Sequence, residues 1–149
     1  MKTIPNMHRQ TGSGLLEVMV AVLVLSLGLL GLAGLQARTL QQNQSSLQRS
    51  QAVLLSYSML DALRIDRQGA INGAYNIAQT CVPPAPNGNL ANDTISNWLT
   101  SLRNRLGANP TTCGSITCAI SGICTVRIFW DDSRAGGGAN ETFESRTQI

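Results

Sequence analysis

Glu17 is a lone acidic side chain at the edge of a long apolar stretch. Its neighbours are Leu15, Leu16, Val18 and Met19. An ionised carboxylate in hydrocarbon costs roughly 3 kcal/mol unless a cation pairs with it. The stretch holds no positive side chain at helical spacing from Glu17. The carboxylate therefore needs a cation from outside the stretch, or a position among the membrane headgroups where it reaches water.

A cut in the chain would supply the cation. Cleavage after Gly12 leaves a free α-amino group on Ser13, four residues before Glu17. On a neighbouring copy of the chain, this amine can pair with the carboxylate. The junction thus predicts a functional role for Gly12, Ser13 and Glu17 together.

The same cut would remove two residue types on which many enzymes depend. Lys2 is the only lysine and His8 the only histidine, and both precede Gly12. The rest of the chain then has no lysine for a Schiff base and no histidine for a triad or a metal site. A net charge of +3 with few aromatics also argues against a nucleic-acid surface. We expect no enzyme, no catalytic residue, no cofactor, no metal and no direct nucleic-acid partner.

Residues 18–35 contain no charged side chain. As a helix this run spans about 27 Å, close to the thickness of the bilayer core. Gly28, Gly31 and Gly34 recur at every third residue and would let another helix approach closely. The alternatives are a buried core helix, or a secretory signal peptide cut near residues 32–37. We favour a membrane-spanning helix, because a chain this small has little other structure to cover the run.

The cysteines indicate the side of the membrane. All four follow the apolar run: Cys81, Cys113, Cys118 and Cys124. An even number in a small domain suits disulfides and an oxidising compartment, so we place the C-terminal part in the periplasm. Three connectivities are possible, and we favour Cys81–Cys113 with Cys118–Cys124. A zinc site is the alternative, although the close C-x2-C spacing is missing.

Residues 36–68 continue the helix in amphipathic form, with no proline or glycine before Gly69. The predicted inner stripe combines a repeat of seven with its extension: Leu40, Leu47, Leu54, Tyr57, Leu60 and Leu63. Gly69 and the Asn72-Gly73 pair should end the helix. One half therefore needs lipid or other helices, and the other half needs a sheet to pack on.

Residues 69–149 should form a small external domain. A loop is expected at 79–92, then a helix capped by Asn92 or Asp93 that runs to Leu106, with Trp98, Leu99 and Leu102 facing inward. Strands are predicted at 115–120, 124–130 and 142–149, with the turn between the first two at Ser121-Gly122 and with Val126, Ile128 and Trp130 on one face. The fold class is α+β, an antiparallel sheet on the long helix.

The segment between the last two strands holds several oxygen ligands. Asp131, Asp132, Asn140 and Glu141 flank three consecutive glycines. A calcium site is conceivable there, but the regular loop spacing is absent and we favour a solvated hairpin loop. Residues 133–139 are expected to be mobile.

The block from Gly12 to Ala21, GSGLLEVMVA, resembles the processing site of type IV prepilins and pseudopilins. The resemblance implies a prepilin peptidase that cuts after Gly12 and methylates Ser13, with Glu17 registering subunits. That family usually has phenylalanine where this chain has Ser13. The later blocks 47–67, 93–102 and 126–132 resemble PilV-type minor pilins. The implied parts are a leader at 1–12, a membrane or filament-core helix at 13–35, its amphipathic half at 36–68, and a periplasmic domain at 69–149.

The expected function is that of a minor pilin in type IV pili, supporting assembly, twitching motility or adhesion. Its partners would be the prepilin peptidase, other major and minor pilins, and the inner membrane. It would cross that membrane once before assembly and then lie in the pilus at the cell surface. Two alternatives stay open: a minor pseudopilin of type II secretion, and an anchored periplasmic binding domain that never polymerises.

Overall fold

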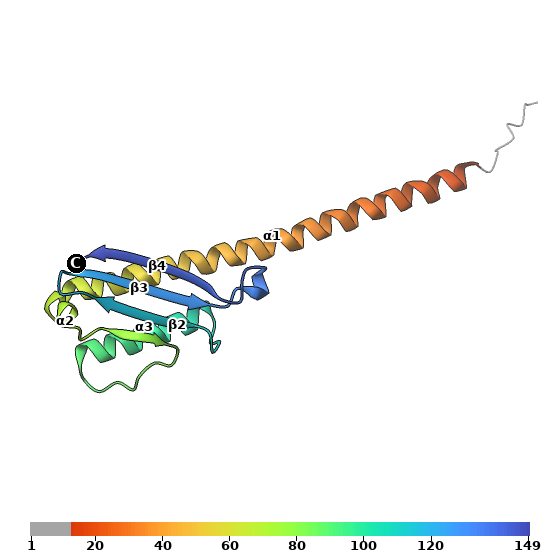
Figure 1. Ribbon diagram of the computed structural model, residues 1–149. Coiled ribbons are helices and arrows are strands. Elements are labelled where there is room, and N and C mark those ends of the chain that lie inside the picture. Colours follow the sequence, from red (N-terminus) through yellow and green to blue (C-terminus); the bar gives the residue numbers. More distant parts are fainter. Residues whose placement is uncertain (1–12) are drawn as a thin grey trace, which may run out of the picture. The chain divides into compact units, whose positions relative to one another are not determined.

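The computed structural model describes residues 13–149, and the predicted leader, residues 1–12, lies outside them. The chain folds as two compact units, the first ending at Thr39 and the second spanning Leu40–Ile149. The elements in order are α1 (Ser13–Ile65), α2 (Arg67–Ile71), β1 (Ile77–Thr80), α3 (Leu90–Leu106), β2 (Cys113–Cys118), β3 (Ile123–Trp130), the 3-10 turn η1 (Ser133–Ala135) and β4 (Glu141–Gln148) (Figure 1).

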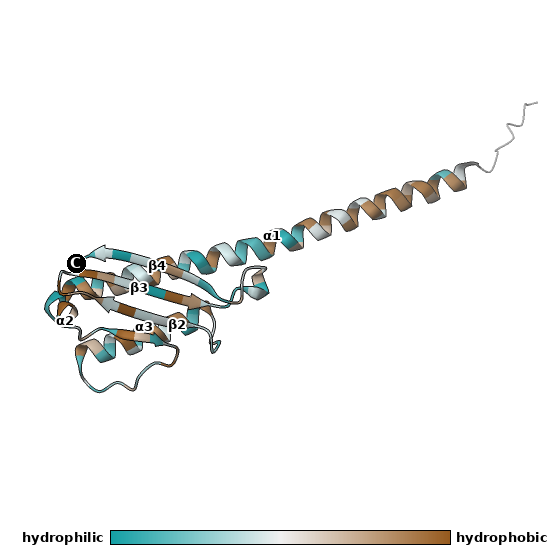
Figure 2. Cartoon of the chain, viewed as in Figure 1, coloured by the Kyte–Doolittle hydropathy of each residue, from teal (hydrophilic) through white to brown (hydrophobic). Residues whose placement is uncertain are grey.

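α1 contains 53 residues, and no proline interrupts it. Hydrophobic residues dominate its first part, and polar residues appear among them further along (Figure 2). Within the described residues, α1 is the one helix long and apolar enough to cross a membrane. No side chain of that apolar part is buried. This agrees with the expectation that the first half of the helix has no covering of its own.

The second part of α1 buries a different face from the predicted one. Ala52, Leu55, Met59 and Leu63 lie in the core, at spacings of three and four residues. That spacing follows the helical period of 3.6. Leu60 and Leu63 were correctly placed in the core. The rest of the predicted stripe was wrong, because Leu40, Leu47, Leu54 and Tyr57 are between 53% and 69% exposed.

The end of α1 comes earlier than predicted. The helix stops at Ile65, and Gly69 lies inside the short α2 rather than ending α1. Asp66 caps α2 by accepting a hydrogen bond from the Gly69 N–H at 3.1 Å. A side chain at residue 69 would place its Cβ 2.3 Å from the Asp66 carboxylate, so only glycine fits the cap. The Asn72-Gly73 pair does form the following turn, with Gly73 at φ +82°.

α3 begins at Leu90, two residues before the predicted capping region. Its cap is Asn89, whose side chain accepts bonds from the N–H groups of Ala91 and Asn92. The predicted caps, Asn92 and Asp93, instead bond the preceding loop, where the Asp93 carboxylate accepts from the Asn87 N–H at 2.9 Å. The predicted inner face is confirmed, since Trp98, Leu99 and Leu102 are buried.

Four antiparallel strands form one sheet in the order β1-β2-β3-β4. The three predicted strands are present, with β2 starting and ending two residues earlier than expected. β1 was not predicted, because it has only four residues and runs into a segment rich in proline and asparagine. Gly122 forms the predicted turn between β2 and β3 at φ +82°.

The helices α1 and α3 share one core with the sheet. Val126, Ile128 and Trp130 lie on its buried face, as predicted, together with Ile116. Trp98 joins both helices to the sheet, because its indole N–H donates to the Leu55 carbonyl at 3.0 Å. The ring also lies against β2, where a Cβ on Gly114 would be 2.4 Å from it. The second unit is therefore an α+β layer of helices on an antiparallel sheet.

Candidate functional site

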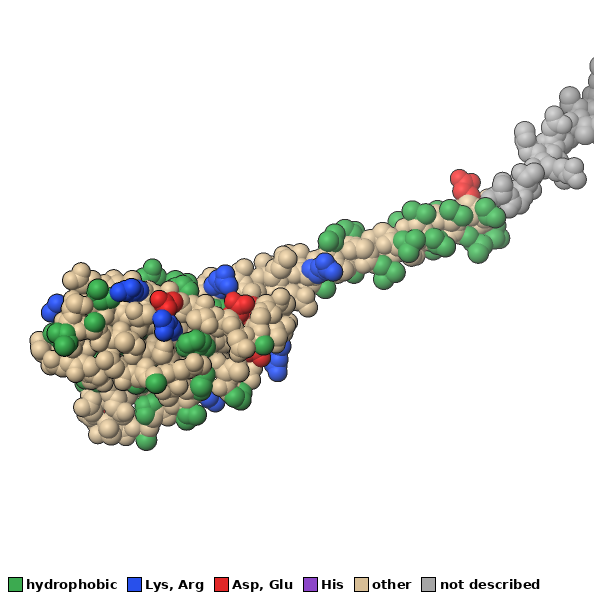
Figure 3. All heavy atoms as spheres, viewed as in Figure 1, with side chains coloured by type: hydrophobic (Ala, Val, Ile, Leu, Met, Phe, Trp, Pro, Cys, Tyr) green, Lys and Arg blue, Asp and Glu red, His purple; other side chains and the backbone are tan. Residues whose placement is uncertain are grey.

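The first candidate site is the apolar part of α1, which begins at Ser13. Its large apolar side chains are exposed from 53% at Val20 to 73% at Leu15. Figure 3 shows hydrophobic side chains spread along this part of the helix. Gly12, the predicted residue before the cut, lies outside the described residues, so the structure says nothing about the cleavage position.

Glu17 is exposed in this unit. None of the three ion pairs formed in the described part of the chain includes it. Ser13 and Glu17 belong to the same helix and are separated by four residues, about one turn. Glu17 is therefore accessible to a cation from outside the chain.

The three glycines of the apolar part leave their faces open. A Cβ built on Gly28, Gly31 or Gly34 would meet no atom within 4 Å. Nothing in this unit therefore requires glycine at these positions. Open faces of this kind would suit contact with another helix, so the packing role of these glycines stays a prediction.

A second exposed apolar feature lies on the part of α1 that belongs to the domain. Leu40, Leu47, Leu54 and Tyr57 form what we call the leucine stripe. At about 100° per residue, Leu54 lies roughly 140° around the helix from Met59, a core residue. The stripe therefore faces away from the core. The sequence repeat was real, but it marks the outer face rather than the inner one.

Two side chains of α1 bind acidic residues in and beside the segment between β3 and β4. Asp132 is 3% exposed and accepts a hydrogen bond from the Ser45 hydroxyl of α1. Glu141 forms an ion pair with Arg49, one helical turn further along, at 3.1 Å. Neither Ser45 nor Arg49 was predicted to contact this segment, because two polar residues on a mixed helix face give no signal of their own.

The Asp131 carboxylate also accepts hydrogen bonds from neighbouring residues. The donors are the Ser133 N–H at 2.9 Å and the Asn109 amide at 3.1 Å. The bonds from Ser133, followed by nearby Arg134 and the bond from Asn109, hold the pKa of Asp131 below its usual value. Within residues 13–149, no three acidic, histidine or cysteine side chains gather as metal ligands. The acidic residues of this segment serve as bonding partners of the fold.

The segment expected to be mobile has a defined backbone. η1 spans Ser133–Ala135, and Gly136 follows in the left-handed region at φ +83°. The Asp132 N–H donates to the Gly138 carbonyl, and the Gly137 N–H returns a bond to the Asp132 carbonyl. A Cβ on Gly137 would lie 2.3 Å from the Asp132 carboxylate, which explains one of the three glycines.

An open cleft of about 460 Å³ lies beside this segment. Its walls carry amide and charged side chains, among them Gln48, Arg105, Asn109, Asp131 and Arg134. Both signs of charge are present, and no aromatic ring lines it. The cleft thus has no stacking surface for a flat ligand.

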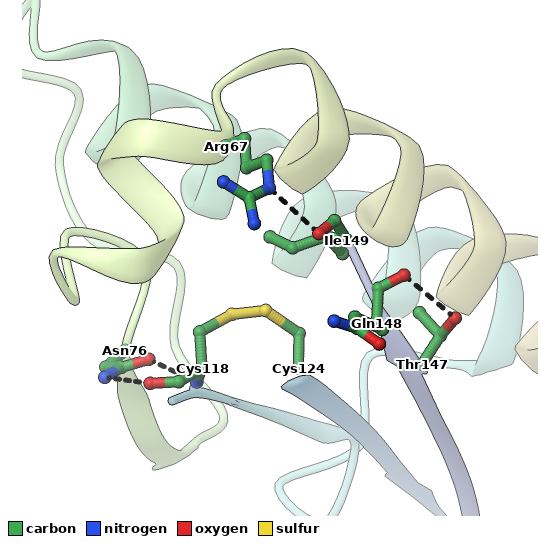
Figure 4. Close-up of a disulfide and its surroundings, with 7 residues drawn as sticks. All are labelled: Arg67, Asn76, Cys118, Cys124, Thr147, Gln148 and Ile149. Atoms are coloured by element: carbon green, nitrogen blue, oxygen red, sulfur yellow. Dashed lines mark hydrogen bonds between the residues drawn. A yellow bond between two sulfur atoms is a disulfide. The ribbon is translucent and has the colours of Figure 1, made fainter. Parts of the chain in front are cut away.

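Both disulfides join the cysteine pairs that the sequence analysis favoured. Cys81–Cys113 links the end of β1 to the start of β2, with an S–S distance of 2.04 Å. Cys118 and Cys124 face each other across β2 and β3 (Figure 4). The Asn76 side chain holds the main chain of Cys118 beside this disulfide. It accepts a hydrogen bond from the Cys118 N–H and donates one to the Cys118 carbonyl.

No protein-family model, no curated protein and no solved structure matches this chain. The fold and the residues described above are therefore the basis for a functional proposal.

Proposed function

We propose that this chain is a minor pilin, cut after Gly12 by a prepilin peptidase and built into type IV pili through α1. One observation carries the proposal. The first part of α1 exposes its apolar side chains on all sides and bears Glu17 one turn after Ser13. A helix of this kind needs lipid before assembly and other helices after it.

The new amine and the acid are chemically complementary. After the cut, Ser13 carries a positive α-amino group at the start of the helix. Glu17 of an incoming subunit loses water when it enters the apolar filament core, at a cost of roughly 3 kcal/mol if it stays unpaired. Pairing with the amine of the neighbouring subunit offsets this cost at a single axial position. The pair thereby sets the stagger between subunits.

The second unit offers further support. Its leucine stripe exposes Leu40, Leu47, Leu54 and Tyr57 on the side of the helix that faces away from the core. Large apolar side chains that gather on one side of a helix suit contact with another apolar surface. Two disulfides cross-link the domain, which suits the periplasm and the cell surface.

The mass of the membrane-extracted protein tests the proposal. We expect a chain that starts at Ser13 and carries one added methyl group. Gly12→Val should leave the full-length chain uncut, whereas the neighbouring Thr11→Val should be processed normally. An unaltered protein that retains residues 1–12 in the membrane would contradict the proposal and would favour an anchored domain that does not polymerise.

A second assay separates the pilus from the pseudopilus of type II secretion, because both share the processing and the helix. Filaments are sheared from cells and probed for this chain. We expect it in the sheared fraction, and we expect its loss to reduce piliation or twitching. Loss of protein secretion with intact pili would point instead to the pseudopilus.

A further inference from the structure

β4 forms one edge of the sheet and offers its outer side to another strand. It pairs with β3 over eight consecutive residues, from Glu141↔Trp130 to Gln148↔Ile123, with no shift of register. It contains no proline and no bulge. Proteins commonly protect an edge with such features, with a short strand or with charged side chains, and of these β4 has only the charges of Glu141, Glu144 and Arg146. β1, at the other edge, has only four residues, so β4 is the edge on which a further strand can be added.

The ladder shows which main-chain groups of β4 point outward. The Ile149 N–H donates to the Gly122 carbonyl at 2.9 Å, which continues the β3–β4 register by one pair. Since inward and outward groups alternate along an antiparallel strand, the odd-numbered residues bond β3. The even-numbered residues therefore turn their N–H and C=O groups away from β3: Thr142, Glu144, Arg146 and Gln148.

The second disulfide supports the same assignment. Cys118 and Cys124 face each other with a Cα–Cα distance of 4.1 Å, which is typical of a non-hydrogen-bonded pair. Cys124 therefore directs its main-chain groups toward β4, where its partner is the odd-numbered Thr147. In the described part of the chain, no main-chain hydrogen bond from another segment reaches the four outward residues.

We infer that β4 pairs with β4 of a second copy of this chain, antiparallel and centred on Ser145. In this register Thr142 faces the other copy's Gln148, and Glu144 faces the other copy's Arg146. Each outward residue then meets an outward residue, so the N–H and C=O groups of all four are paired on both chains. The arrangement is isologous and closed, and it joins two four-stranded sheets into one.

The charges of Glu144 and Arg146 favour this register over registers shifted by one or two residues. The centred register creates two Glu144–Arg146 pairs, one on each side of the two-fold axis. A shift by two residues places either Glu144 opposite Glu144 or Arg146 opposite Arg146, and like charges directly opposite are destabilising. A shift by one residue places the outward N–H and C=O groups of one β4 opposite residues of the other β4 whose groups point inward. The hydrogen bonds between the two strands are then lost. Within each chain, Glu144 already contacts Arg127 at 2.5 Å, so charges would alternate across the joined sheet.

The two-fold axis also determines which molecules can meet in this way. It lies perpendicular to the sheet, and it reverses every segment that runs along the strands. In Figure 1 the Leu40–Ile65 part of α1 runs close to the direction of β4. The two copies of this segment would therefore point in opposite directions. The contact suits molecules that approach from opposing sides, and neighbours that share one direction within a filament cannot form it.

Cysteine cross-linking tests the register. Ser145 lies on the axis, and its Cα would be about 4.5 Å from its counterpart, within the range for a disulfide. Ser145→Cys should therefore form an intermolecular disulfide when the full-length protein is oxidised in detergent. The control is Thr147→Cys, whose two copies would lie about 13 Å apart at the strand rise per residue. Equal cross-linking of the two variants, or none with Ser145→Cys, would overturn the inference.

Charge reversal tests the pairing without cysteines. Glu144→Arg and Arg146→Glu should each weaken dimerisation about tenfold, because each creates two like-charge contacts. The double variant restores opposite charges between chains and should return to within about threefold of the unaltered protein. Sedimentation of the full chain in detergent measures these constants. An unaltered protein that stays monomeric, or a double variant no better than the single ones, would refute the pairing.

The double variant also controls for folding, because it lacks the Arg127–Glu144 contact just as Glu144→Arg does. At a concentration low enough for both variants to be monomeric, its thermal stability should equal that of Glu144→Arg, while its dimerisation recovers at higher concentration. Processing at Gly12 should be unchanged in all these variants, so this inference and the proposed function fail independently.

Discussion

Glu17 is the residue on which the proposed assembly depends most directly. Replacing it with alanine removes the one charge from the apolar part of α1, so membrane insertion should be kept or improved. The variant should nevertheless be lost from sheared filaments, because the amine of the neighbouring Ser13 has no acid to meet. Immunoblots of the membrane and sheared fractions measure both outcomes.

The matched control for that experiment is Glu17→Asp, which keeps the charge on a shorter side chain. We expect partial incorporation from it. If the alanine variant entered filaments as well as the unaltered protein, the pairing of Glu17 with Ser13 would be wrong.

Tyr75 makes the stability of the domain sensitive to high pH. Its ring is buried, and its hydroxyl donates to the Asp66 carboxylate at 3.1 Å. Burial first, and then the bond to Asp66 and its negative charge, raise the pKa of Tyr75 above 10.0. The folded state therefore holds its proton more tightly than the unfolded state does. This contribution to stability is complete below the unfolded pKa and is lost as the pH rises through the folded pKa.

Urea unfolding between pH 8 and about 11 measures this effect. We expect the free energy of unfolding to fall at the alkaline end and Tyr75→Phe to flatten that fall. Tyr57 is the other tyrosine, 53% exposed on the leucine stripe, and Tyr57→Phe is the matched control. If the unfolding free energy of Tyr75→Phe fell as steeply with pH as that of the unaltered protein, the Tyr75 hydroxyl would not have this role.

At the scale of elements, the two disulfides should differ in their contribution to stability. Cys81–Cys113 closes 32 residues of chain and Cys118–Cys124 closes 6. From loop-closure entropy, the longer loop is stabilised by about 4 kcal/mol and the shorter by about 2 kcal/mol. Paired serine substitutions should therefore lower the unfolding free energy more at positions 81 and 113 than at 118 and 124. Urea denaturation of the two variants checks this order, which an equal or reversed loss would contradict.

Much of this architecture could be predicted from local patterns. The uncharged run at 18–35 indicates a helix without a core, and alternation in β3 places Val126, Ile128 and Trp130 on one face. The ends of the helices were harder to predict, because each depends on one or two hydrogen bonds from a capping side chain. Asn89 caps α3 and Asp66 caps α2, although several other asparagines and aspartates nearby are equally able to cap. β1 is held by pairing with β2, which no local pattern of four residues reveals.

The inner face of α1 could not be predicted for a different reason. A hydrophobic repeat shows that a helix face is apolar, but it does not show what covers that face. The core contacts use the small Ala52 and Ser56 together with Leu55 and Met59, so the buried face looks less apolar than the exposed one. The contacts of Ser45 and Arg49 with the segment after β3 depend on tertiary structure in the same way.

At the scale of the whole molecule, substitutions in the leucine stripe should affect assembly without affecting folding. Leu47 and Leu54 are exposed and make no part of the core, so Leu47→Gln with Leu54→Gln should change the melting temperature of the domain little. The same substitutions place polar groups where the proposed function requires apolar contact between subunits. Incorporation into filaments should therefore fall strongly while processing at Gly12 and folding continue.

Met59→Gln with Leu63→Gln is the matched control on the buried face of the same helix, with both residues at most 1% exposed. Burying two polar side chains without partners should cost several kcal/mol, about 1–3 for each. That variant should lose folding and incorporation together, as measured by circular dichroism and by filament shearing. If the stripe variant lost its folding as well, the stripe would belong to the core. If it assembled normally, the stripe would have no part in filament contacts, and the apolar half of α1 alone would carry the assembly.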